Sequence, residues 1–125
     1  MKVVHIAITV KDLEVSKAFY TNIFGFVFVN EFVKAETGAK FCYLDKDGFQ
    51  LELWEFSTLK SVANNLVDFD VIGLRHIGFQ VEDVAQEVAR LNALGCNFPE
   101  AKVGTSGKTF SIGSDPDGIL LELIN

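Results

Sequence analysis

Apolar and polar side chains alternate along residues 3–10 of the chain. The even-numbered positions are all valine or isoleucine, whereas the odd-numbered positions include His5, Ala7 and Thr9. Strict alternation is typical of a β-strand that buries one face against a core. We therefore predict a first strand whose apolar face is buried and whose other face carries His5.

A helix and three further strands are predicted to follow this strand. Asp12 suits the N-cap of the helix and Gly25 suits its C-terminal end. The apolar positions expected on the buried helix face are Leu13, Ala18, Phe19 and Ile23. The strands are expected near residues 26–33, 40–45 and 49–56. The first half of the chain is thus predicted to have the order β-α-β-β-β.

The second half of the chain repeats the landmarks of the first half. The stretch HIAITVKDLEVSKAFYTNIFGF from His5 is matched by HIGFQVEDVAQEVARLNALGC from His76. Downstream, DKDGFQLEL is matched by DPDGILLEL, which places Glu52 and Glu122 at equivalent positions. Four landmarks that recur in the same order indicate two copies of one supersecondary unit.

The repeat gives a prediction for the whole fold. The second copy should contain a strand over 76–81, a helix from Asp83 to Gly95, and strands near 109–113 and 119–124. We predict one α+β domain that is built from two βαβββ modules. Module 1 covers about residues 1–56, a linker covers 57–72, and module 2 covers about 73–125. Leu59, Val62, Ala63 and Leu66 hint at a short helix in the linker.

Four ionisable side chains share the face of the predicted strands that does not pack on the helices. These residues are His5, Glu52, His76 and Glu122. A carboxylate in an apolar interior is costly unless it is paired or binds a cation. A single strand histidine is more often a hydrogen-bonded core residue, and a single strand glutamate usually faces solvent. Two imidazoles and two carboxylates at matching positions of a repeat instead favour a site for a divalent metal.

Composition narrows the classes of function. The net charge of −6 argues against an extended nucleic-acid surface. No apolar run reaches the roughly 18 residues of a membrane span, and no secretory leader is expected. Two cysteines make no disulfide framework, so the cytoplasm is the expected compartment. Most of the twelve phenylalanines are expected in the core.

Two further patterns carry little chemistry. The stretch KVGTSGKT over 102–109 lacks the first glycine of a phosphate-binding loop, where Lys102 stands instead. A surface turn is favoured there over a mobile loop that faces the substrate. The Asp-Gly dipeptides at 47–48 and 117–118 are interpreted as turns.

The chain resembles the vicinal-oxygen-chelate superfamily, which includes glyoxalase I, bleomycin-resistance proteins and extradiol dioxygenases. The stretch from His5 and the closing SDPDGILLELIN carry the resemblance. It implies paired βαβββ modules that form curved mixed sheets around a site for one divalent metal: nickel, zinc, cobalt or manganese. The family's ligand positions fall on His5, Glu52, His76 and Glu122. This set resembles glyoxalase I most closely.

The resemblance also defines candidate substrate residues. Bacterial glyoxalase I has an arginine and an asparagine for glutathione where this chain has Thr9 and Phe56. Thr cannot replace the bidentate bonds of an arginine, which argues against glutathione as the thiol. Lys108 is the nearest loop cation, and Gln50 lies beside Glu52 on the same face.

We expect a metal-dependent isomerase or lyase of the lactoylglutathione lyase type that moves a proton next to a chelated carbonyl. The resemblance implies Glu122 as the first candidate for general base and Glu52 as the second. The alternatives are an epimerase of an acyl thioester and a binding protein that sequesters a drug or toxin. Small relatives often share sites between chains, so a homodimer with two shared sites is expected. Residues Leu59, Val62, Leu66, Val67 and Phe69 are the candidates for its seam.

Overall fold

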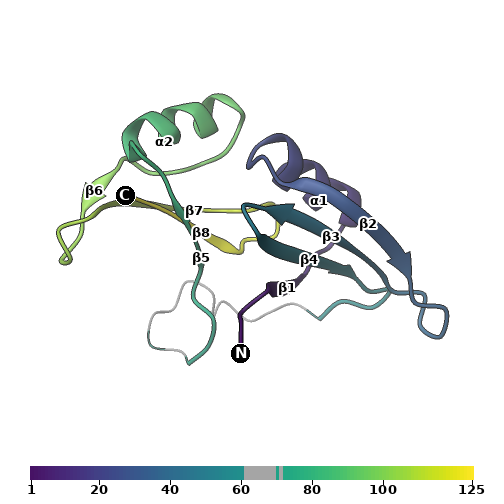
Figure 1. Ribbon diagram of the computed structural model, residues 1–125. Helices are drawn as coiled ribbons and strands as arrows, with labels where there is room; N and C mark the ends of the chain where they lie inside the picture. Colours follow the sequence, from purple (N-terminus) through teal and green to yellow (C-terminus); the bar gives the residue numbers. More distant parts are fainter. Residues whose placement is uncertain (61–69, 71) are drawn as a thin grey trace. The chain divides into compact units, whose positions relative to one another are not determined.

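The computed structural model describes residues 1–60, 70 and 72–125. The chain divides into two compact units, Met1–Ser61 and Val62–Asn125 (Figure 1). The proposed linker helix and most of the proposed seam, at Val62, Ala63, Leu66, Val67 and Phe69, lie outside the described residues. Leu59 of the seam is described and is exposed.

The first unit is a four-stranded sheet with one helix. Its elements are β1 (His5–Thr9), α1 (Leu13–Asn22), β2 (Val27–Val33), β3 (Lys40–Lys46) and β4 (Phe49–Glu55). The strand order is β1-β4-β3-β2, with β1 parallel to β4 and the other pairs antiparallel. Helix α1 contacts β2, β3 and β4 on one face of this sheet. The opposite face is therefore not covered by the unit's own helix.

The second unit repeats this architecture. Its elements are β5 (Ile77–Gln80), α2 (Val84–Ala93), β6 (Lys102–Val103), β7 (Thr109–Ser114) and β8 (Leu120–Ile124). The strand order is β5-β8-β7-β6, again with one parallel pair, and α2 contacts β7 and β8. The predicted α+β fold of two β-α-β-β-β units is confirmed.

Local signals placed both helices correctly. The side chains of Asp12 and Asp83 cap α1 and α2 by accepting hydrogen bonds from backbone N–H groups three residues ahead. Gly25 and Gly95 follow the helices with positive φ angles of 71° and 91°, which glycine adopts without strain. The helix boundaries therefore follow from the residues that cap them.

Two details of the sequence prediction were wrong or missing. Helix α1 buries Leu13, Ser16 and Tyr20, whereas Ala18 is exposed. The helix face is thus rotated from the predicted one, because the aromatic ring of Tyr20 packs against Phe19, Phe24 and Phe26. Strand β6 was not located, because its two residues are too few to show alternation.

The expectation that the phenylalanines are mostly core also fails in part. Phe28, Phe32 and Phe56 each expose 40% or more of their surface. Two of them, Phe32 and Phe56, belong to a stack of aromatic rings described below.

The hairpin turn between β3 and β4 sets the register of the first sheet. Asp47 and Gly48 have φ angles of 51° and 79°, and two central residues with positive φ are the mark of a type I′ turn. This turn pairs Tyr43 with Glu52 and Phe41 with Trp54. The equivalent turn of the second unit is longer. There the Asp115 backbone pairs with Ile119, and the Asp115 side chain accepts bonds from Asp117 and Ile119.

Candidate metal and substrate site

The first unit brings His5 and Glu52 together on the sheet face opposite α1. Glu52 lies between buried Leu51 and Leu53, which point to the helix side. The distance from His5 Nε2 to Glu52 Oε2 is 3.7 Å. The Glu52 side chain is only 11% exposed, whereas that of His5 is 45% exposed. The alternation predicted from the sequence therefore directs both groups to the same face.

Tyr43 is a third member of this group. It is the cross-strand partner of Glu52, and its hydroxyl donates a hydrogen bond to the Glu52 carboxylate. Burial, together with the negative charge and hydrogen bond of Glu52, raises the pKa of Tyr43 above its usual value. Tyr43 therefore remains a neutral donor that orients one glutamate oxygen.

The second unit brings His76 and Glu122 together in the equivalent place. His76 Nε2 lies 3.1 Å from Glu122 Oε2, and the two side chains are 29% and 17% exposed. The other ring nitrogen of His76, Nδ1, is buried without a hydrogen-bond partner among the described residues. The strand neighbours of Glu122 are Gly78 and Ile112, neither of which has a polar side chain. This glutamate thus has no counterpart of Tyr43 on its neighbouring strands.

The donor atoms fit a divalent ion with mixed nitrogen and oxygen ligands. Two adjacent ligands of an octahedral ion, with bonds of about 2.1 Å, lie about 3.0 Å apart. The His76–Glu122 separation of 3.1 Å already matches this value. The His5–Glu52 pair at 3.7 Å needs a small side-chain adjustment. Each pair can supply two adjacent ligands.

The structure joins the four predicted ligands as two pairs, one in each unit. Residues 1–60, 70 and 72–125 contain no cluster of three or more His, Cys, Asp or Glu side chains that could hold a metal. The set of four therefore stays a prediction.

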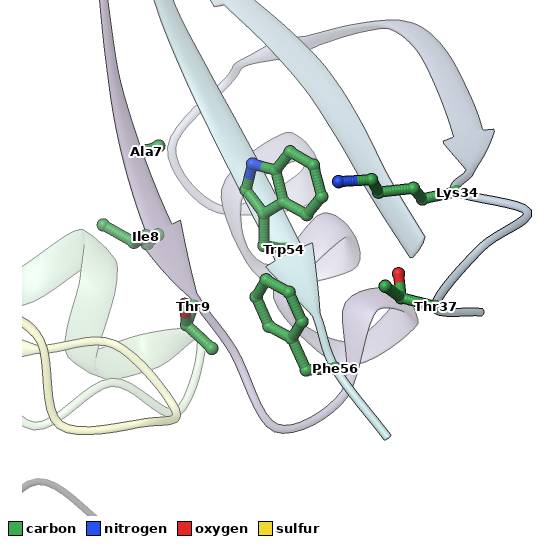
Figure 2. A pocket seen from close by; sticks show the side chains of 7 residues that line it. All are labelled: Ala7, Ile8, Thr9, Lys34, Thr37, Trp54 and Phe56. Carbon is green, nitrogen blue, oxygen red and sulfur yellow. The ribbon is translucent and has the colours of Figure 1, made fainter. Parts of the chain in front are cut away.

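A cavity of about 300 Å³ opens in the first unit, and its lining includes Ala7, the β1 register partner of Glu52. Its walls come from β1, the β2–β3 hairpin and the end of β4, as Figure 2 shows. The lining residues are Ala7, Ile8, Thr9, Lys34, Thr37, Trp54 and Phe56. The cavity lining thus includes Thr9 and Phe56, two of the residues predicted from the sequence to bind substrate.

The two other predicted substrate residues lie elsewhere. Gln50 is the register partner of His5, and its side-chain amide donates a 3.0 Å hydrogen bond to Asp45. Lys108 belongs to the second unit and is exposed in the turn between β6 and β7, where its carbonyl accepts a bond from Gly104. The favoured interpretation of 102–109 as a surface turn agrees with this hairpin.

Sequence reasoning missed Tyr43, Lys34 and Trp54. A signal for two of them was present, because a two-residue Asp47-Gly48 turn places Tyr43 opposite Glu52 and Trp54 opposite Phe41. Lys34 had no comparable signal, since the direction of a hairpin-loop side chain is not set by strand alternation.

Comparison with known proteins gives a consistent family. The model of the Glyoxalase/Bleomycin resistance protein/Dioxygenase superfamily matches residues 2–123. The uncharacterized protein YaeR of Escherichia coli is 33% identical over 95% of this chain and 92% of its own. The mitochondrial methylmalonyl-CoA epimerase of Bos taurus is 28% identical over 95% of this chain and 71% of its own.

A solved structure with a similar fold is the trypanothione-dependent glyoxalase I of Leishmania major. It superposes with a TM-score of 0.77 at 26% identity, over 100% of this chain and 86% of that one. In addition, none of the described helices has the length and apolar character needed to cross a membrane.

Proposed function

Because the chain belongs to the Glyoxalase/Bleomycin resistance protein/Dioxygenase superfamily, we propose that it is a metal-dependent isomerase or lyase of the glyoxalase type. The observation that carries this proposal is the pair of matched His–Glu contacts, one on the open face of each sheet. A purely structural glutamate gives no reason for the same pairing to recur in both units. The proposed ligands are His5, Glu52, His76 and Glu122.

The proposed reaction moves a proton on the carbon next to a carbonyl. A bound divalent ion would polarise the carbonyl and stabilise the negative charge that develops on its oxygen. Glu122 takes the proton as general base, because its side chain is slightly more exposed than that of Glu52 and its neighbouring strands offer it no hydroxyl donor like Tyr43. Gly78 supports this role, since a side chain at that position would lie in contact with Glu122 Oε2. Tyr43 instead holds Glu52 in its orientation.

A second candidate reaction is the epimerisation of a small acyl thioester. The similarity to a methylmalonyl-CoA epimerase favours it, and the first step, proton removal next to a carbonyl, is the same. The two reactions differ only in where the proton returns and in the substrate that the site admits.

The test measures this shared step and the substrate separately. Metal-loaded protein is assayed with hemithioacetals of methylglyoxal and several thiols, and with a racemisable acyl thioester in deuterated water. Glu122→Gln should keep the native circular dichroism spectrum and lose about 10²-fold or more of kcat, because an amide cannot accept the proton. Wild-type turnover in Glu122→Gln would exclude Glu122 as the base. Absence of isomerisation and deuterium incorporation with all substrates would contradict the proposed reaction.

Glutathione is expected to be a poor thiol for this protein. Thr9 and Phe56 offer neither the guanidinium nor the amide that binds it in the resembling enzymes. A kcat/KM of about 10⁶ M⁻¹s⁻¹ or more with the glutathione adduct, well inside the usual enzyme range, would show this inference wrong.

A further inference from the structure

We infer that the cavity of the first unit is a specificity pocket for an aromatic group that carries a negative charge. This inference rests on the proposed function, because it names the class of substrate that would present its carbonyl to Glu52 and Glu122. The pocket then accounts for the part of the substrate that extends away from the reacting carbon.

One wall of the cavity is built from stacked aromatic rings. Trp54 stacks on Phe41 with ring centroids 4.1 Å apart and on Phe56 with centroids 5.6 Å apart. Phe32 stacks on Phe41 at 5.1 Å, so the row of rings crosses from β4 to β2. Rings held in this way lose little side-chain freedom when a ligand binds. Their exposed faces and edges suit a flat apolar group rather than a polar peptide.

The outer ring of the stack is open to such a group. Phe56 is 40% exposed, and its neighbour Trp54, which lines the same cavity, is half-buried. An exposed aromatic ring beside a concave surface is a feature of ligand sites more often than of ordinary protein surface. The aromatic ring of a ligand would cover this surface and gain apolar burial.

A lysine side chain also lines the cavity. Lys34 comes from the β2–β3 hairpin, and its side chain extends towards the Trp54 ring (Figure 2). Within the described part of the chain its ammonium group forms no ion pair, whereas the nearby Lys40 lies 3.5 Å from Glu55. Among the residues that the structure describes, no carboxylate lines the cavity, and the hydroxyls of Thr9 and Thr37 add hydrogen-bonding capacity. An anionic substituent therefore has a charged partner here, whereas a cationic one meets the like charge of Lys34.

The cavity lies at a useful distance from the proposed metal ligands. Trp54 follows Glu52 by two residues on the same face of β4, and their β1 partners are Thr9 and Ala7. Two residues of strand span about 7 Å, which is the reach of a short chain plus a ring. The volume of about 300 Å³ is at the lower end of small-molecule sites, so it suits one aryl group.

The chain provides its own reporter for this pocket, because Trp54 is its single tryptophan. We would titrate metal-free protein in chelator with three probes and follow tryptophan fluorescence. The probes are phenylacetate, phenethylamine and butyrate, which separate the aromatic ring from the charge. Phenylacetate should give a saturable change with a Kd in the millimolar range, as expected for a fragment of this size. Phenethylamine and butyrate should bind at least about threefold more weakly, because each lacks one of the two interactions.

Two lysine variants test the assignment of the charge. Lys34→Gln should lower the affinity for phenylacetate about threefold or more, and it should not lower the affinity for phenethylamine. Lys40→Gln is the matched control, since it removes the same charge from the same hairpin outside the cavity lining, and it should leave both affinities unchanged. The inference is overturned if fluorescence does not saturate, if phenethylamine binds as tightly as phenylacetate, or if the two variants behave alike.

Failure of the proposed function remains distinguishable from failure of this inference. Metal content and proton transfer are measured on metal-loaded protein, whereas the fluorescence titration needs neither metal nor turnover. Metal-free protein that binds phenylacetate as described supports the pocket even when no isomerisation is found. Metal-dependent turnover without saturable phenylacetate binding overturns the pocket alone.

Discussion

Removing the metal should lower the thermal stability of this protein by an amount that the structure allows us to estimate. Glu52 and Glu122 are 11% and 17% exposed, so each carboxylate has lost most of its water and faces an imidazole. A cation that binds only the folded chain stabilises it by RT ln(1 + [M]/Kd), which is about 2.7 kcal/mol at a hundredfold excess over Kd. The unfolding entropy of 125 residues is about 0.26 kcal/mol/K. Metal binding is therefore expected to raise the Tm by about 10 °C, and removing the metal should lower it by the same amount.

Glu122→Gln should abolish most of this metal-dependent rise. The amide oxygen is a weaker ligand, and an affinity reduced about 100-fold leaves only about 0.4 kcal/mol at the same metal concentration, or about 2 °C. Because the variant also loses the His76 contact, the quantity to compare is the difference between metal-loaded and chelated samples. Glu100→Gln is the control, since Glu100 is exposed in the same unit and should keep the full rise.

The assay is calorimetric melting in chelator and with nickel, zinc, cobalt or manganese. Equal Tm values with and without each metal in the wild type would refute the reasoning. A rise of the same size in Glu122→Gln would show that the metal binds without this ligand.

Three further predictions concern assembly, pH and packing. One subunit carries His5→Ala and Glu52→Ala, a second carries His76→Ala and Glu122→Ala, and the two are mixed under exchange conditions. The mixture should recover metal binding if a homodimer shares its sites. No recovery in any mixture would place the sites within single chains. Burial raises the pKa of the Cys42 thiol to about 11 from 9.0, so between these pH values only the thiol of the unfolded chain ionises. The free energy of unfolding should therefore fall by about 2–3 kcal/mol as pH rises through this window. Urea unfolding of Cys42→Ala should lack this part of the decline, and identical declines in the variant and the wild type would contradict the assignment. Gly113→Ala should lower the free energy of unfolding by about 1–3 kcal/mol, because the new methyl would lie 2.8 Å from the buried Phe98 ring. Gly78→Ala, whose methyl would meet Glu122 only at 3.8 Å, should lower it by clearly less in the same unfolding assay.

Much of the architecture could be predicted because its signals are local. The alternation around His5 and Glu52, the caps at Asp12 and Asp83, and the repeat itself each act within a few residues. These signals define which residues form strands and which face each side chain takes. They were enough to predict that each His–Glu pair lies on one face of its sheet.

The substrate pocket could not be predicted in the same way. Whether Phe32, Phe41 and Trp54 stack depends on the register of three strands, and β2 shifts its register between Phe28 and Asn30. The position of Lys34 depends on how the β2–β3 hairpin folds back, with Lys34 N–H donating to the Ala39 carbonyl. Neither can be read from the periodicity of one segment.

The lengths of the two hairpin turns, Asp47–Gly48 in the first unit and Asp115–Ile119 in the second, determine how each half of the chain tolerates insertions. One extra residue in the Asp47–Gly48 turn that slipped the ladder by one position would move Tyr43 away from Glu52 and Phe41 away from Trp54, since a register slip of one residue sends side chains to the opposite face. The longer turn from Asp115 to Ile119 is already held by its own side-chain bonds, so an added residue can be absorbed as a larger loop. Length variation among homologous chains is therefore expected to concentrate between β7 and β8 and to be rare between β3 and β4.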